Sequence, residues 1–149
     1  MSADKKSLRL EPVKELAERE EQEQATRCAA VQQQYLHQQQ KLEELQQYYA
    51  DYSSAVAEQS GDVKQLQESR EFLARLAMAI RQQGDSVKRC ALQLEEIHQQ
   101  WLSARRHSKS MEQLIERYRT VERSDEARRE QRDSDDINNQ RHSWLQRRS

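Results

Sequence analysis

Residues 66–118 decide the fold, and they read LQESREFLARLAMAIRQQGDSVKRCALQLEEIHQQWLSARRHSKSMEQLIERY. Alternate steps of three and four residues through this segment meet apolar side chains at all but three of sixteen positions. These positions are Leu66, Ser69, Leu73, Leu76, Ile80, Gln83, Val87, Cys90, Leu94, Ile97, Trp101, Ala104, Ser108, Met111, Ile115 and Tyr118. A heptad repeat sustained this long indicates a helix that packs against another helix, and not one that lies on a sheet.

The composition favours helices alone. The 149 residues include two glycines and one proline, and no stretch alternates with the two-residue period of a strand. Apolar residues make up 34% of the chain, whereas about 45–50% is usual in a globular domain. A core of several layers cannot be built from that supply, but one buried stripe on each of two helices can.

A second heptad seam lies earlier in the chain, and it supplies the partner helix. Its clear part consists of Cys28, Val31, Tyr35, Gln38, Leu42, Leu45, Tyr49, Tyr52 and Val56. Further back the same register meets Gln24, Glu21, Ala17 and Lys14, so we expect loose pairing there. Pro12 suits a first helical turn, where its missing N–H costs nothing, and it marks the expected start.

Ser60-Gly61-Asp62 is the one strong break between the two seams. Asp62 can cap the following helix, with Gln65 three residues on as its capping-box partner. Because so short a linker makes the helices antiparallel neighbours, we predict an all-α fold, a long antiparallel two-helix coiled coil (α-hairpin) with a C-terminal helical overhang. Within a single unit of residues 1–149, the expected ranges are 12–58 for the first helix, 59–62 for the turn, 63–132 for the second helix and 133–149 for a frayed tail.

Two axial registers fit this turn. One sets Cys28 beside Cys90 and gives the mixed a–d layers that are usual in antiparallel coiled coils, which favours it slightly. The other sets Gln38 beside Gln83 in one polar layer. In either register, residue 12 faces roughly residue 108. We therefore expect the chain beyond about residue 110 to extend past the end of the first helix, and the seam to fail at Glu122.

Apolar residues outside the seams gather on one flank near the turn. In an antiparallel pair, g positions face g positions, and here these carry Tyr48, Ala55, Phe72 and Ala79. The spacing puts the rings of Tyr48 and Phe72 side by side. They either thicken the seam or form an exposed apolar patch that docks a partner. The residues at the e positions on the opposite flank, at the same level, are polar or small.

The chemistry-bearing residues do not form a catalytic or metal-binding pattern. The four histidines are scattered, and His98 has no histidine or cysteine at metal-ligand spacing. Two cysteines do not make a disulfide framework, so Cys28 and Cys90 are expected as reduced seam residues. The sequence has no phosphate-binding loop or nucleophile elbow. We expect no enzyme activity, no cofactor and no metal.

Charge and hydropathy give little pull toward nucleic acid or membranes. The formal net charge is -1, and the arginines of residues 117–148 are interleaved with nearly as many acids. Counterion-release binding to nucleic acid would therefore be weak. No apolar run approaches the roughly 18 residues that span a bilayer, and residues 1–10 lack a signal-peptide core. These features predict a cytoplasmic protein without direct membrane insertion.

Several segments together resemble the flagellar FliJ family. They are LQQYYADY at residues 45–52, FLARLAMAIRQQ at residues 72–83, a tryptophan further on at Trp101, and EQRDSDD at residues 130–136. The segments extend over nearly the whole chain in family order and spacing. The resemblance implies an antiparallel coiled coil, similar to the stalk of rotary ATPases, in the bacterial flagellar type III export apparatus.

The resemblance also implies partners and a site. Its partners would be the hexameric flagellar export ATPase, the cytoplasmic domain of the export gate protein, and export chaperones. The implied location is peripheral, at the cytoplasmic face of the inner membrane through the export apparatus. The positions that match the family's gate contact are Lys41, Leu45, Tyr48, Tyr52, Phe72, Leu76, Ala79 and Gln83.

Two alternatives remain open from the sequence. The chain could be the equivalent stalk of a virulence-type injectisome, which belongs to the same class of assembly. It could also be a coiled-coil arm that binds nucleic acid through the arginines of its C-terminal segment.

Overall fold

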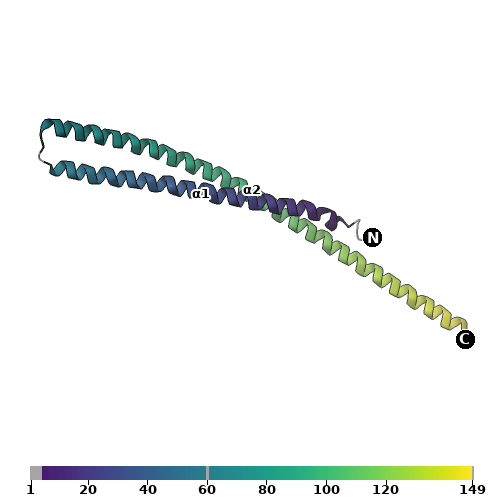
Figure 1. The fold of residues 1–149 in the computed structure, drawn as a ribbon. Helices are drawn as coiled ribbons and strands as arrows, with labels where there is room; N and C mark the ends of the chain where they lie inside the picture. Colours follow the sequence, from purple (N-terminus) through teal and green to yellow (C-terminus); the bar gives the residue numbers. More distant parts are fainter. Residues whose placement is uncertain (1–4, 60, 149) are drawn as a thin grey trace. The chain divides into compact units, whose positions relative to one another are not determined.

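The computed structural model describes residues 5–59 and 61–148, and these form two helices joined by a short turn (Figure 1). Helix α1 spans Lys6–Glu58 and helix α2 spans Val63–Arg148. No strand occurs within the described ranges. The two helices pack against each other, so the predicted all-α hairpin is confirmed.

The chain divides into two compact units, and the division falls inside both helices. The turn unit comprises residues 22–103, and the terminal unit comprises residues 1–21 together with residues 104–149. Each unit contains one stretch of α1 and one of α2, so each has its own helix–helix seam.

In the turn unit, the buried stripe follows the predicted heptads. All nine α1 positions from Cys28 to Val56 are half-buried, and so are the α2 positions from Ser69 to Trp101. Leu66 is the exception, since it is 37% exposed beside the turn. Half-burial is what a two-helix seam provides, because each side chain is covered by one neighbouring helix and not by a surrounding core.

The turn is closed by a helix cap. The Gln65 N–H donates to Oδ1 of Asp62 at 2.8 Å, and the Leu66 N–H donates to the Asp62 carbonyl at 3.1 Å. Asp62 is therefore the predicted N-cap of α2. A Cβ on Gly61 would stand 2.5 Å from Oε1 of Gln65, the end of an exposed and flexible side chain that can swing aside. Ser60, the first residue of the expected break, lies outside the described residues.

The register of the turn unit is the one that pairs two glutamines. The Gln83 Nε2 donates to Oε1 of Gln38 at 2.7 Å and to the Gln38 carbonyl at 2.8 Å. The slight preference for the register with Cys28 beside Cys90 was wrong. In the observed register the two amides satisfy each other, whereas the other register would place them against apolar and aromatic neighbours.

The terminal unit contains the four most buried residues of the described chain. Ala17 is 3% exposed and Ile115 is 1% exposed, and Ser7 and Ser108 are also buried. The expectation of loose pairing before residue 28 was therefore wrong for this stretch. Three of the four side chains are small, and small residues let two helix backbones approach closely enough to exclude water.

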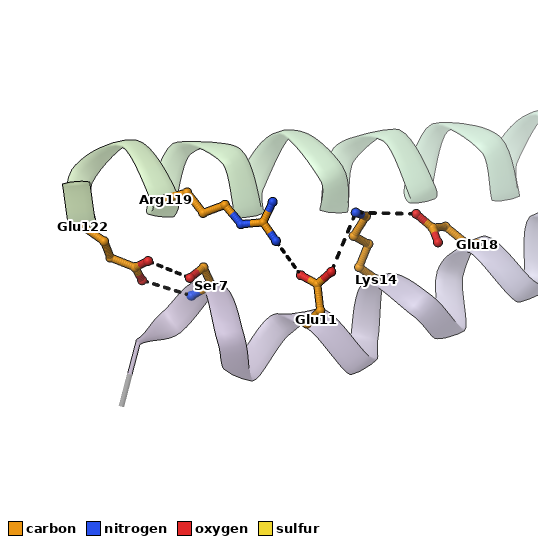
Figure 2. A network of polar contacts seen from close by, with 6 residues as sticks. All are labelled: Ser7, Glu11, Lys14, Glu18, Arg119 and Glu122. Atoms are coloured by element: carbon orange, nitrogen blue, oxygen red, sulfur yellow. Dashed lines mark hydrogen bonds and ion pairs between the residues drawn. The ribbon is translucent and has the colours of Figure 1, made fainter. Parts of the chain in front are cut away.

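Pairing in this unit extends further along α2 than the sequence indicates. Ser7 donates from its hydroxyl to Glu122 Oε2 at 2.6 Å and from its N–H to Glu122 Oε1 at 3.2 Å (Figure 2). Glu122 is half-buried and continues the heptad register. The seam thus does not fail at this residue, and the overhang begins after it and not near residue 110, because a carboxylate and a serine form a polar layer.

The same contacts explain why α1 begins at Lys6 and not at Pro12. Figure 2 shows Glu11 between two cations: Arg119 Nη2 lies 3.1 Å from Glu11 Oε2, and Lys14 Nζ lies 3.9 Å from Glu11 Oε1. The Lys6 ammonium lies 5.4 Å from the ring centroid of Tyr118. The two contacts that join the helices, of Glu11 with Arg119 and of Lys6 with Tyr118, offset the backbone hydrogen bond that Pro12 removes inside α1.

Beyond Glu122, α2 continues to Arg148, and every described residue from 123 to 148 is exposed. The frayed tail expected from residue 133 is helical in the structure. The segment contains no glycine or proline, and contacts one turn apart support it. The Gln131 amide donates to Asp135 at 3.2 Å, and the Arg148 guanidinium lies 4.4 Å from the centroid of the Trp144 ring.

Gln24 is a weak point of the turn unit. Its side-chain oxygen is buried and, among the described residues, has no hydrogen-bond partner. Replacing Gln24 by methionine should therefore raise the free energy of unfolding by about 1–2 kcal/mol, because an unsatisfied buried acceptor costs about that much. Thermal unfolding followed by circular dichroism measures the change. Gln22→Met changes an exposed residue in the same helical turn of α1. This control should change the free energy of unfolding by less than about 0.5 kcal/mol.

The contact between Ser7 and Glu122 should respond to acid. The side-chain hydrogen bond from Ser7, aided by the backbone bond from Ser7 and nearby cations, lowers the pKa of Glu122 below its ordinary value of 4.5. Its stabilisation is therefore complete above pH 4.5 and is lost as pH falls through the lower folded-state pKa. The protection factor of the Ser7 amide, which is its exchange rate by NMR corrected for the intrinsic rate at each pH, should fall over that range in the native chain.

The variant Glu122→Gln should flatten this pH dependence, because an amide does not titrate there. Glu112→Gln, which changes an exposed acid of the same helix, is the matched control and should leave the acid response of the Ser7 amide unchanged. Equal responses in the native chain and in Glu122→Gln would contradict the assignment.

Candidate docking surface

Three aromatic rings from both helices form a cluster near the turn, hereafter the aromatic cluster. The Tyr48 and Phe72 centroids lie 6.2 Å apart with an interplanar angle of 78°, and those of Tyr52 and Phe72 lie 4.7 Å apart at 58°. Tyr48 and Tyr52, one helical turn apart on α1, lie at 6.4 Å and 26°. The prediction that Tyr48 and Phe72 lie side by side is confirmed.

The cluster combines anchored rings with an accessible one. Tyr52 and Phe72 are half-buried, which fixes their positions, while Tyr48 is 51% exposed. Edge-to-face and tilted pairs at these separations add about 0.5–1.5 kcal/mol each beyond burial. The result is a rigid apolar ridge with one face open to solvent, which is the arrangement of a contact hot spot.

The remaining residues of the predicted site fall into two groups. Lys41 is exposed and can contact a partner, whereas Leu45, Leu76 and Ala79 are half-buried. Gln83 is half-buried too, and its amide is already bonded to Gln38. These four half-buried residues therefore support the surface from the helix–helix seam, and Tyr48, Phe72 and Lys41 offer the accessible atoms.

The structure adds one contact that the spacing did not indicate. Tyr52 occupies a d position, so the heptad places it in the seam, yet its ring is the closest one to Phe72. A heptad position fixes the direction in which a side chain leaves the helix, but it does not fix where the ring of a long side chain lies. The only signal in the sequence was the family resemblance, which included Tyr52.

The opposite flank of the turn unit is different in character. It carries a shallow groove lined by Cys28, Gln32, Tyr35, Ala91, Leu94, Glu95 and His98. The His98 ring packs on Trp101 with centroids 5.7 Å apart, so this histidine is occupied by a ring contact. Cys28 and Cys90 are half-buried free thiols.

The described residues also bear on metal binding and on membrane insertion. Among residues 5–59 and 61–148, no three histidine, cysteine or acidic side chains gather closely enough to hold a metal ion. Within the same ranges, neither helix has a stretch that is both long and apolar enough to cross a membrane.

The fold defines a class of protein: an antiparallel two-helix coiled coil, here with an aromatic cluster on one flank. Comparison with protein families identifies the member of that class. The family described as "Flagellar FliJ protein" matches residues 5–147. The chain therefore belongs to the flagellar FliJ family, as its resemblance predicts, and this gives it a role related to flagellar export. No curated protein and no solved structure matches the chain.

Proposed function

We propose that this protein is a non-enzymatic stalk and chaperone escort of the bacterial flagellar type III export apparatus. It inserts into the hexameric export ATPase and contacts the cytoplasmic domain of the export gate protein. The observation that carries the proposal is the family match over residues 5–147, which spans both helices of the hairpin. The location that follows is cytoplasmic and peripheral, at the inner membrane through these partners and without direct membrane insertion.

The terminal segments are the part proposed to enter the ATPase ring, roughly residues 1–25 and 100–149. Residues 123–148 support this assignment, because every one of them is exposed along the last part of α2. Because helices in proteins take most of their stability from tertiary packing, an exposed stretch of this kind gains stability from a partner. Its large apolar residues Ile137, Trp144 and Leu145 are 63%, 53% and 55% exposed, so contact surface is available.

The hairpin end is the part proposed to reach the export gate. The aromatic cluster supports this, since Tyr48 presents an open ring that Phe72 and Tyr52 hold in place. Lys41 supplies an exposed cation on the same flank. Empty export chaperones are the third proposed partner.

The family match favours the flagellar system over a virulence-type injectisome. No observation in the described residues favours the nucleic-acid arm. Arginines of α2 pair with acids of their own surroundings, as in the contacts of Arg119 with Glu11 and of Arg123 with Glu116 at 3.1 Å each.

The stalk assignment is tested with the cognate hexameric ATPase. We expect the full chain to copurify with the ATPase and to raise its turnover severalfold. A chain that ends at residue 122, and so keeps the Ser7–Glu122 layer, should retain its helicity and lose most of that effect. Absence of copurification by the full chain would contradict the stalk assignment.

The gate assignment is tested separately. Phe72→Ala and Tyr48→Ala should each weaken binding to the gate domain about tenfold or more, because hot-spot aromatics cost about 2 kcal/mol when truncated. Titration calorimetry measures the affinity, and circular dichroism verifies unchanged helicity. Met78→Ala, which truncates a 60% exposed side chain away from the cluster, is the control. Unchanged binding by both aromatic variants would remove this assignment.

A further inference from the structure

We infer that the Gln38–Gln83 pair selects the axial register of the turn unit and thereby positions the aromatic cluster. Both side chains occupy heptad positions in the seam and both are half-buried. The single Gln83 amide group donates to the side-chain oxygen of Gln38 at 2.7 Å and to its backbone carbonyl at 2.8 Å. Gln38 and Gln83 are thus positioning residues, and this role is independent of any partner.

A polar pair is needed to select the register, because the other seam residues discriminate little between the two registers. The other seam residues are mostly Leu, Ile, Val and Tyr, and these pack acceptably against one another in either of the two layer patterns. Moving α2 by about one helical turn, roughly 5 Å, converts one pattern into the other. Hydrophobic burial changes little in that shift, so a directional interaction has to decide.

The shifted register would break the glutamine pair. It would set Cys28 beside Cys90, Gln38 beside Ile80, and Gln83 beside Tyr35. Each amide would then be half-buried against an apolar or aromatic side chain, without the partner it has now. A polar pair at one seam layer is a known way to select one register among several, at a cost in stability.

The same shift would dismantle part of the docking surface. The closest ring contact, between Tyr52 and Phe72 at 4.7 Å, joins the two helices directly. Axial displacement of α2 by about one turn, roughly 5 Å, would carry Phe72 from the level of residue 49 to that of residue 46, and so away from Tyr52. The glutamine pair therefore controls the shape of the cluster, and its effect on gate binding rests on the function proposed above.

Two cysteine pairs report the two registers. The native Cys28 and Cys90 report the shifted register, since they face each other only there. Cys28 and a cysteine introduced at residue 94 report the observed register, because Cys28 and Leu94 line the same groove. The second reporter is the variant Leu94→Cys with Cys90→Ser. Diamide oxidises two thiols to one disulfide and is itself reduced to the hydrazine, and dilute protein with non-reducing electrophoresis isolates the intramolecular product.

The variant Gln38→Leu with Gln83→Leu removes the pair and keeps the apolar seam. We expect the Cys28–Cys90 disulfide to form at least tenfold faster in this variant than in the native chain. Gln33→Leu with Gln82→Leu changes two exposed glutamines of the same helices and should crosslink at the native rate. The second reporter, which carries Leu94→Cys, should crosslink readily whenever the glutamine pair is intact.

Restoring a directional pair should restore the register. Gln38→Glu with Gln83→Lys places complementary charges at the same layer, so crosslinking between Cys28 and Cys90 should fall back toward the native rate. Equal Cys28–Cys90 rates in the native chain and the double leucine variant would overturn the inference. Because this readout needs no partner, it separates failure of the register inference from failure of the gate assignment, which affinity for the gate domain tests.

Discussion

The structure depends on one constraint: two amphipathic helices with too few apolar residues for a core must bury a single stripe against each other. Only 34% of the chain is apolar, and most seam positions of the turn unit are half-buried and not fully buried. Each half-buried residue of such a seam stabilises the fold only slightly, so polar contacts contribute a larger share of the free energy of helix pairing. In both units these contacts connect α1 to α2 at defined levels.

The two units use polar contacts in different ways. In the turn unit, the Gln38–Gln83 pair lies within an otherwise apolar seam and separates one register from another. In the terminal unit, Glu122 binds the first turn of α1 through Ser7, and Glu11 bonds to Arg119 of α2. These contacts hold the start of α1 against α2 ahead of Pro12, where the helix lacks one of its own hydrogen bonds.

A two-helix protein has no enclosed interior, so its surface has to carry its function. The flagellar FliJ family match places the chain in an export-related role, and the surface features agree with a protein that works by contact. The aromatic cluster presents a ring held by two others. The single helix of residues 123–148 exposes several large apolar side chains. Exposed apolar surface of this kind is typical of interaction sites.

Local pattern alone determined much of this protein. The heptads predicted both seams because burial on a helix repeats every 3.5 residues. The Asp62 cap and the neighbouring rings of Tyr48 and Phe72 followed from short-range spacing. Only the tertiary structure decided the register, the extension of pairing to Glu122, and the contact of Tyr52 with Phe72. These depend on which residues distant in sequence meet, and periodicity is the same for every register that preserves the stripe.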